Sequence, residues 1–248
     1  MDLHNDLHMM VTPSDWEVSA IILEQRRHPA ICEIGAGNGD WGIAAAITGR
    51  ADHLVLVEDF SFTKAGFDPG YFWPRDAFDL LRHCHEKLRQ LSADPNLVCV
   101  TDVTQVPERR YDIIRLDCLT ELHQVRAVLD WMCEAIADDG LLFVDDLPPN
   151  KAPNRWIACV EKIAADVLKP VWFGQSEGVF CKKSFNCREL QDLILGREHT
   201  GSWGTGYTAR WAALGQTVVV QTLSAMATPM PLTTFNVEQL DDLRNRLA

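Results

Sequence analysis

The stretch around which this chain is organised reads Cys32-Glu33-Ile34-Gly35-Ala36-Gly37-Asn38-Gly39-Asp40-Trp41-Gly42. The apolar residues 30–34 predict a buried strand, and the small apolar residues 43–47 predict a helix. Glycines at three alternate positions break the chain between the two. We expect this turn to present free backbone N–H groups at the helix N-terminus, to let a ligand approach the main chain, and to use Asp40 as the helix N-cap.

The turn resembles motif I of the class I S-adenosylmethionine-dependent methyltransferases, Glu/Asp-x-Gly-x-Gly-x-Gly, and all four of its positions are filled here. The resemblance implies a Rossmann-like fold and an enzyme that takes a methyl group from S-adenosylmethionine. It also implies that the turn holds the methionine part of this cofactor, with Glu33, Gly35, Ala36, Gly37 and Gly39 as cofactor-binding residues.

A dinucleotide-binding fingerprint competes with this interpretation. Gly37-x-Gly39-x-x-Gly42 matches Gly-x-Gly-x-x-Gly, and an acid, Glu58, follows at a suitable distance. In that register, however, the strand ends two residues before the first glycine and Glu33 has no role. The rest of the chain therefore has to decide between the two patterns.

Length and composition favour one large domain, or one domain with an appendage, because 47% of the 248 residues are hydrophobic. The net charge of −12 argues against nucleic acid as the main partner, since its phosphates are repelled. No apolar run reaches the roughly 18 residues of a membrane span, and residues 1–10 lack a basic, apolar signal. We therefore expect no membrane partner. None of the eight cysteines forms a Cys-x-x-Cys pair, so we expect free thiols and a cytoplasmic location.

Predicted strands and helices alternate along most of the chain. We expect strands at 30–34, 53–58, 96–101, 111–117, 141–144, 171–174 and 178–182, and helices at 14–27, 40–48, 75–91, 121–137, 153–168 and 188–195. This alternation predicts an α/β fold with a doubly wound, mostly parallel seven-stranded sheet, in which one of the last strands is an antiparallel edge. Apolar spacing predicts that Phe78 and Val167 lie on the buried faces of their helices.

The chain divides into three predicted parts. Residues 1–29 form an N-terminal helical segment, residues 30–183 the S-adenosylmethionine-binding methyltransferase core, and residues 184–248 a C-terminal extension. The extension has a strand-like run at 217–220 and a last helix capped by Asn236. It serves either as a lid over the pocket or as a homodimer contact, and the sequence leaves both open.

Acidic residues follow four successive predicted strands, namely Glu58, Asp102, Asp117, Asp145 and Asp146. Ligands of doubly wound sheets bind beyond the carboxyl ends of the strands, so these acids form a rim around the expected site. We expect Glu58 to bind the ribose hydroxyls, as a strand-end acid does in both methyltransferases and NAD enzymes. The resemblance further implies that Asp102 meets the adenine amino group and that Val103 packs on the adenine ring.

Asp117 and the pair Asp145-Asp146 predict a hard oxygen site that suits Mg²⁺ or Mn²⁺. This arrangement resembles the metal-dependent O-methyltransferases, both of the catechol O-methyltransferase type and of related bacterial natural-product and sugar enzymes. In these families an Asp after strand four and an acid pair after strand five hold the ion, which implies an ion that binds substrate hydroxyls here. The resemblance covers roughly residues 20–183.

We expect Asp117 and His123 to be catalytic, with His123 or solvent as the base. In the bacterial branch an Asp-Gly-x-His segment follows strand four, with another Asp seven residues after the His. His123 and Asp130 keep this spacing, but His123 lies six residues after Asp117 instead of three, and Cys118 replaces the Gly. Catechol-type enzymes carry a Lys where this chain has Thr120. A structural role for His123 stays open, and FkbM-type methyltransferases share only the start of their strand-four signature with this chain.

An aromatic segment, residues 59–74, holds six aromatic residues in sixteen positions, against 8% in the whole chain. Its glycines and prolines forbid a regular helix. We expect this segment to be a lid or a substrate wall, with a surface anchor or a subunit contact as the alternative.

These observations favour Mg²⁺-dependent O-methylation of a small-molecule hydroxyl, on a natural-product or sugar-like acceptor. The first alternative is a metal-independent class I methyltransferase that acts on N, O or C. The second is an NAD(P)-dependent oxidoreductase, or a cofactor-binding protein without catalysis. Against the oxidoreductase, no Tyr-x-x-x-Lys pair occurs in the sequence.

Overall fold

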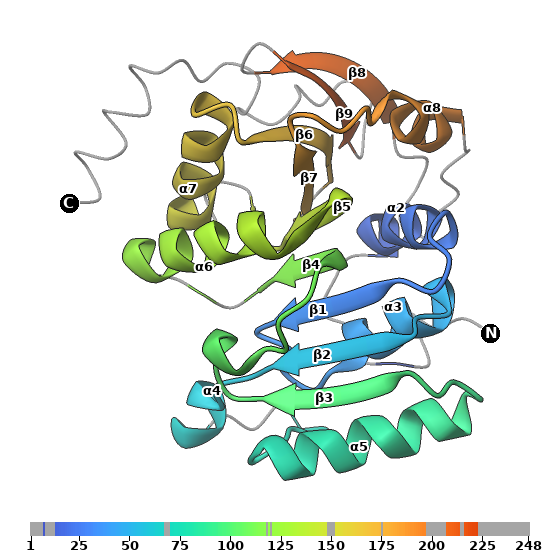
Figure 1. Cartoon of the computed structure of the whole chain (residues 1–248), viewed down its shortest axis with the longest axis vertical. Coiled ribbons are helices and arrows are strands. Elements are labelled where there is room, and N and C mark those ends of the chain that lie inside the picture. Colours follow the sequence, from blue (N-terminus) through green and yellow to red (C-terminus); the bar gives the residue numbers. More distant parts are fainter. Residues whose placement is uncertain are drawn as a thin grey trace.

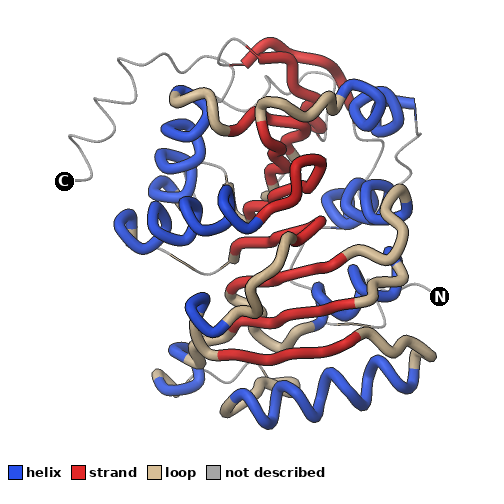
Figure 2. The backbone as a smooth tube through the Cα atoms, in the orientation of Figure 1, coloured by secondary structure: helices blue, strands red, loops and turns tan. Residues whose placement is uncertain are grey.

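The structure, a computed structural model, describes residues 7, 13–66, 70–117, 119, 121–147, 152–174, 176–196, 207–213 and 216–222. One twisted sheet runs through the molecule, with helices on both of its faces (Figure 1). Figure 2 shows how loops connect the strands to the helices at both ends of the sheet. In chain order the elements are α2 (Pro13–Glu24), β1 (Ala30–Ile34), α3 (Asp40–Gly49), β2 (His53–Val57), α4 (Ser61–Lys64), α5 (Ala77–Gln90), β3 (Asn96–Val100), the 3-10 turn η1 (Val103–Gln105), β4 (Tyr111–Leu116), α6 (Leu122–Ala135), β5 (Ile136–Val144), α7 (Pro153–Ala164), β6 (Leu168–Phe173), β7 (Gly178–Lys182), α8 (Arg188–Gly196), β8 (Tyr207–Ala213) and β9 (Gln216–Thr222).

The described strands form one sheet in the order β3-β2-β1-β4-β5-β7-β6-β9-β8. The neighbouring strands β3, β2, β1, β4 and β5 pair in parallel, whereas β7 runs antiparallel to both β5 and β6. Strands β1 to β7 thus confirm the predicted α/β fold with a mostly parallel seven-stranded sheet. The reversed strand lies between β5 and β6 and not at an edge, so that detail of the prediction is wrong. In the dinucleotide-binding order 3-2-1-4-5-6 the sixth strand lies beside the fifth, and the inserted β7 departs from it.

Helices cover both faces of the sheet. Successive residues of a strand point to opposite faces, so each group of helices packs against a different set of strand residues. One face packs against α2, α3, α5 and α8, and it presents Ile31, Leu54, Leu56, Ile113, Leu141 and Phe143. The other packs against α6 and α7, and it presents Cys32, Val55, Ile114, Leu142 and Val144. The same alternation decides which face the polar residues near the strand ends share.

Two residues that we expected in the core lie at the surface. Phe78 is 71% exposed, because α5 turns a different face toward the sheet and buries Leu80, Cys84 and Leu88. Val167 is 39% exposed, because α7 ends at Ala164 and no longer carries it inward. Both errors arise from helix phase and length, which apolar spacing alone fixes poorly.

The described part of the C-terminal extension continues the main sheet. β9 confirms the predicted strand at 217–220 and pairs with β6 in parallel, and β8 closes a hairpin against β9. The last helix, with Asn236 as its predicted cap, lies outside the described residues. Among the helices that the structure describes, none has the length and apolar character needed to cross a membrane.

Candidate functional site

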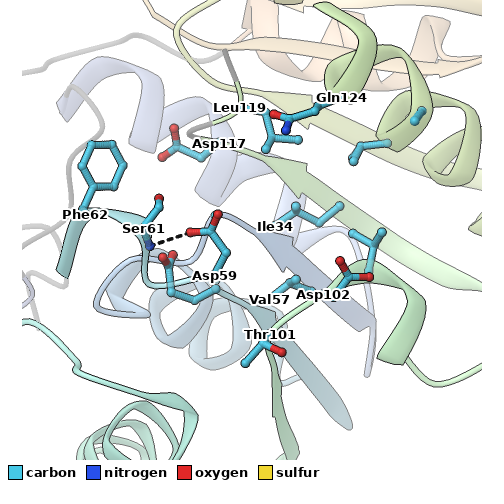
Figure 3. A pocket seen from close by; sticks show the side chains of 15 residues that line it. Ile34, Val57, Asp59, Ser61, Phe62, Thr101, Asp102, Asp117, Leu119 and Gln124 are labelled. Carbon is cyan, nitrogen blue, oxygen red and sulfur yellow. Dashed lines mark hydrogen bonds between the residues drawn. The ribbon is translucent and has the colours of Figure 1, made fainter. Parts of the chain in front are cut away.

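A cavity of about 310 Å³ lies at the carboxyl ends of β1, β2, β3 and β4 (Figure 3). Its volume falls in the range of small-molecule sites, roughly 300 to 1,000 Å³. Among the predicted site residues, those that line it are Gly35, Glu58, Asp102, Val103 and Asp117. In Figure 3, Phe62 and Ser61 lie on one side of the cavity, whereas Thr101 and Asp102 lie on the other.

The lining of the cavity is acidic. It contains Glu58, Asp59, Asp102 and Asp117, and none of the described lining residues is Lys or Arg. Such a wall repels phosphates and favours cations and hydroxyl groups. Gln124 and Leu119 also line the cavity, and no sequence motif predicted a role for either.

The glycine turn adopts the left-handed backbone that its sequence requires. Gly35, Gly37 and Gly39 have φ angles of 79°, 56° and 81°, which residues with a Cβ rarely adopt. Gly39 is the N-cap of α3, and Asp40 is the first helical residue, so the predicted N-cap is wrong by one position. A Cβ at Gly37 would lie 2.9 Å from Trp73 Cη2, so an aromatic ring already closes one side of the turn.

Four amides of the turn that we expected to be free are engaged inside the protein. Gly35 and Ala36 donate their N–H groups to the Val57 carbonyl, at 2.9 and 3.1 Å. The N–H of Gly37 donates to Glu58 Oε2 at 2.7 Å, and that of Gly39 to the Ala36 carbonyl at 2.8 Å. Because these four N–H groups already donate inside the protein, they are not available to bind an anionic group of a ligand.

Glu58 joins the turn to the end of β2. Its carboxylate accepts hydrogen bonds from the N–H groups of Gly37 (2.7 Å) and Phe60 (3.0 Å), and the residue is buried. Burial raises the pKa of this carboxyl above its usual value, although the two backbone donors oppose the shift. Each carboxylate oxygen has two lone pairs, so Glu58 keeps the capacity to accept from ligand hydroxyls.

Asp102 and Val103 border the cavity after β3. Asp102 caps η1, where its Oδ1 accepts from Thr104 N at 2.8 Å and from Thr104 Oγ1 at 2.7 Å. These hydrogen bonds hold the pKa of the Asp102 carboxyl below its usual value. Val103 is half-buried beside it and lends the cavity an apolar surface.

Asp117, Asp145 and Asp146 come together as predicted, with one oxygen of each within 4.8 Å of the others. Asp117 also lines the cavity, so this acid cluster adjoins it. Asp145 is buried, and its Oδ1 has no hydrogen-bond partner among the described residues. Asp146 turns the chain with a φ of 50°, a conformation that Asp tolerates better than most residues.

Arg115 stands at the centre of these acids. Its Nη2 lies 2.9 Å from Asp145 Oδ2, and its Nη1 lies 3.2 Å from Asp117 Oδ2 and 3.0 Å from Glu33 Oε1. Its Nε lies 3.2 Å from Glu177 Oε1. Neither Arg115 nor Glu177 was predicted to have a role, although an Arg among the apolar residues at the end of a buried strand was a usable signal.

Glu33 contacts the first turn of α3 and Arg115. It is buried, it accepts from Gly42 N at 3.0 Å and from Arg115, and it is not among the described residues that line the cavity. Burial raises the pKa of the Glu33 carboxyl to about 8, and Arg115 opposes the shift. Glu33 thus fixes the first turn of α3 and the position of Arg115.

Burial also raises the pKa values of the other enclosed carboxyls, to about 7 for Asp145 and about 8 for Glu177. Four carboxylates surround Arg115, and Arg155 Nη1 lies 3.6 Å from Asp117 Oδ1, so the carboxylates outnumber the guanidinium groups beside them. The remaining negative charge has to be met by protons or by a bound cation.

His123 lies in the first turn of α6, is exposed, and is not among the described residues that line the cavity. Asp130, seven residues later, forms an ion pair with Lys162 of α7. The spacing of His123 and Asp130 therefore does not reflect a pair between them, and a base role for His123 stays a prediction. Cys118 and Thr120, the two departures from the family patterns, lie outside the described residues.

Part of the aromatic segment packs against the glycine turn and the helices beside it. Phe72 stacks on His83 of α5, with ring centroids 3.9 Å apart, and Trp73 lies against Gly37. Phe62 lines the cavity and is 43% exposed. Phe67 and Pro69 lie outside the described residues, so whether the whole segment is a lid or a wall stays a prediction.

Neither a protein-family model nor a curated protein sequence matches this chain. Among solved structures, a methyltransferase from Pyrococcus furiosus is 13% identical over 71% of this chain and 84% of its own, with a TM-score of 0.49. A ribosomal protein L11 methylase from Lactobacillus delbrueckii subsp. bulgaricus is 14% identical over 66% of this chain and 77% of its own, with a TM-score of 0.44.

A magnesium protoporphyrin IX methyltransferase from Synechocystis PCC 6803, solved with S-adenosylmethionine bound, is 13% identical over 67% of this chain and 76% of its own, with a TM-score of 0.47. At such identities the likeness concerns the fold alone. The chemistry of this chain has to be argued from its own residues.

Proposed function

We propose that this protein is an S-adenosylmethionine-dependent methyltransferase that methylates a hydroxyl group of a small molecule with the help of Mg²⁺. One observation carries the proposal: Asp117 belongs both to the lining of the cavity and to the acid cluster. A methyl donor in the cavity and a metal-bound hydroxyl at the cluster would therefore be neighbours.

The cavity suits the proposed cofactor in charge. S-adenosylmethionine carries a positive sulfonium and an ammonium group, and the described lining supplies four acids and no Lys or Arg. Glu58 would bind the ribose, while Asp102 and Val103 would receive the adenine. The engaged amides of the turn and its acidic wall suit a pyrophosphate poorly, which disfavours NAD(P).

The acid cluster fits a divalent cation. Asp117, Asp145 and Asp146 supply the hard oxygens that Mg²⁺ prefers, and Asp145 Oδ1 is buried without a hydrogen-bond partner among the described residues. Arg115 binds Oδ2 of Asp117 and of Asp145, and Arg155 Nη1 lies 3.6 Å from Asp117 Oδ1. Two extra positive charges would also offset the excess of carboxylates around Arg115.

When bound, S-adenosylmethionine supplies an electrophilic methyl group, and Mg²⁺ lowers the pKa of a coordinated hydroxyl. The residues of this chain would orient both partners: Glu58 and the turn would hold the donor, and Asp117, Asp145 and Asp146 would hold the ion that binds the acceptor hydroxyl. His123 or solvent takes the hydroxyl proton. Positioning would supply most of the acceleration, as is general for reactions between two bound partners.

The test is a calorimetric titration with S-adenosylhomocysteine, followed by Mg²⁺ titrations of the wild type and of Asp145→Ala. We expect micromolar S-adenosylhomocysteine binding in both proteins, and a Mg²⁺ heat that Asp145→Ala abolishes. Asp139→Ala, an exposed acid after α6, is the matched control and should keep the Mg²⁺ heat. Methyl transfer to a panel of phenolic, natural-product and sugar-like acceptors, followed by mass spectrometry, should stop on chelation.

The outcomes separate the alternatives. S-adenosylhomocysteine binding and chelator-resistant methyl transfer would point to a metal-independent methyltransferase. Binding of NAD(H) without S-adenosylhomocysteine would contradict the proposal altogether. For the base, His123→Ala should lower kcat without weakening S-adenosylhomocysteine binding, whereas unchanged kcat would leave solvent as the base.

A further inference from the structure

Arg115 is held by more contacts than a structural ion pair requires. Its side chain is 3% exposed, and Glu33 and Glu177 approach it from β1 and from the start of β7. These two carboxylates alone would compensate the buried guanidinium. Arg115 nevertheless binds two further carboxylates, Asp117 and Asp145, on the side of the acid cluster.

The alternation of the strands explains this geometry. Glu33 and Arg115 are register partners in β1 and β4, and Phe143 of β5 is the next partner across. Asp117 lies two residues beyond Arg115, and Asp145 lies two residues beyond Phe143, so all of them point to the face covered by α2 and α3. The ring of Trp41, from the first turn of α3, packs on the guanidinium with its centroid 5.0 Å from Cζ.

A second group of contacts ties Arg115 to the N-terminal helix. The Ser19 hydroxyl, on α2, donates to Glu177 Oε2 at 2.8 Å, while Glu177 Oε1 accepts from Arg115. Both Ser19 and Glu177 are fully buried. A chain of hydrogen bonds thus runs from α2 through Glu177 and Arg115 to Asp117 and Asp145.

We propose that Arg115 is the positioning residue of the acid cluster, and that α2 sets its orientation through Ser19 and Glu177. Arg155 approaches Asp117 Oδ1 at 3.6 Å, but Arg115 is the residue that binds the carboxylates of both Asp117 and Asp145, so its loss would strengthen their mutual repulsion. By binding Oδ2 of both residues, Arg115 holds them together and leaves Asp145 Oδ1 for a cation. This inference rests on the proposed function, because it concerns the same metal site.

Arg115→Lys tests the proposal, because Lys keeps the charge but cannot bridge several carboxylates as a planar guanidinium does. Mn²⁺ affinity is measured by electron paramagnetic resonance, and S-adenosylhomocysteine affinity by calorimetry. We expect Arg115→Lys to weaken Mn²⁺ binding by roughly 10-fold to 100-fold, the usual effect of losing a group that orients metal ligands. S-adenosylhomocysteine affinity should stay within about twofold of wild type. A general loss of structure would instead weaken the binding of both ligands. Arg126→Lys, an exposed Arg that pairs with Glu161, is the control and should leave both affinities unchanged.

Ser19→Ala removes one hydrogen bond to Glu177 and leaves all four carboxylates and Arg115 in the chain. It decides the question if Arg115→Lys does not fold. We expect it to weaken Mn²⁺ binding by roughly 3-fold to 10-fold, the value of one buried hydrogen bond. Unchanged Mn²⁺ affinity in the folded variants would overturn the positioning role, and so would an equal loss of both ligands. If the wild type itself binds no Mn²⁺, the proposed function fails, and this inference fails with it.

Discussion

At the scale of single residues, Glu33 shows how burial changes the role of a motif acid. It fills the acidic position of the glycine motif, yet it contacts Gly42 and Arg115 and is not among the described residues that line the cavity. Its position was predictable, because it lies within a buried strand. Its partner was not, because Arg115 lies 82 residues further along the chain.

The raised pKa of Glu33 makes the free energy of unfolding depend on pH. Burial raises this pKa to about 8, whereas an unfolded Glu titrates near pH 4.3. Between roughly pH 5 and pH 8 the folded state therefore binds more protons than the unfolded state, and stability falls as pH rises. We expect Glu33→Gln to make this fall shallower, by up to about 1.4 kcal/mol per pH unit. Urea denaturation at pH 5.5 and 7.5 measures it, and an unchanged fall would contradict the shift.

Gly37 offers a test of how tightly the turn is packed. Its φ of 56° disfavours any side chain, and a Cβ would lie 2.9 Å from Trp73 Cη2. Gly66 has a φ of 81°, but a Cβ there would meet no atom within 4 Å among the described residues.

We expect Gly37→Ala to weaken S-adenosylhomocysteine binding at least roughly 10-fold, because it costs both backbone strain of about 1–2 kcal/mol and displacement of Trp73. Gly66→Ala carries only the strain and should leave the affinity unchanged. Calorimetric titration of the two variants makes the comparison. Equal affinities would mean that the turn does not bind the cofactor.

At the scale of elements, α2 belongs to the core and not to a separate appendage. Asp15, which is fully buried, accepts hydrogen bonds from Ser176 N and Ser176 Oγ, both at 2.8 Å. At the other end of the helix, Arg26 pairs with the exposed Asp139. The two ends of α2 therefore differ in how much each contact should matter.

We expect Asp15→Ala to lower the free energy of unfolding by about 1–3 kcal/mol, because it leaves two buried donors of Ser176 without an acceptor. Asp139→Ala removes an exposed ion pair and should change stability by about 0–1 kcal/mol. Urea denaturation at pH 7 compares the two variants. Similar losses in both would show that α2 is held mainly by its apolar face.

Element boundaries were predicted well where the chain has strong signals and poorly where it does not. β1 and β7 begin and end where the sequence predicts, next to glycine turns or charged ends. β5 begins at Ile136, inside the predicted helix, because Ile136 pairs with Tyr111 of β4. Such a pairing depends on a distant strand, and apolar periodicity cannot reveal it.

At the scale of the whole molecule, the candidate site and the described part of the C-terminal extension lie at different parts of the sheet. The residues that line the cavity lie between Ile34 and Val128, and the contacts of the acid cluster end at Glu177. Strand β9 of the hairpin β8–β9 instead pairs with β6, at the edge of the sheet opposite β3.

We therefore expect a chain that ends at Gly196 to bind S-adenosylhomocysteine with the affinity of the full chain. The same truncation uncovers the edge of β6, and exposed edges promote pairing between molecules, so the truncated protein should self-associate. Light scattering after gel filtration and calorimetric titration measure the two effects. Loss of binding by a truncated chain that stays folded would mean that the extension takes part in the site.

The sequence by itself determined the glycine turn, the strands and the rim of acids, because these depend on local periodicity and on the strand ends that parallel sheets bring together. Glu58, Asp102 and Asp117 lie at the cavity for this reason. Only the tertiary structure decided that the amides of the turn are already engaged, that β7 runs antiparallel inside the sheet, and that Arg115 joins four carboxylates. Each of these depends on the register between segments far apart in the chain, which no local pattern encodes.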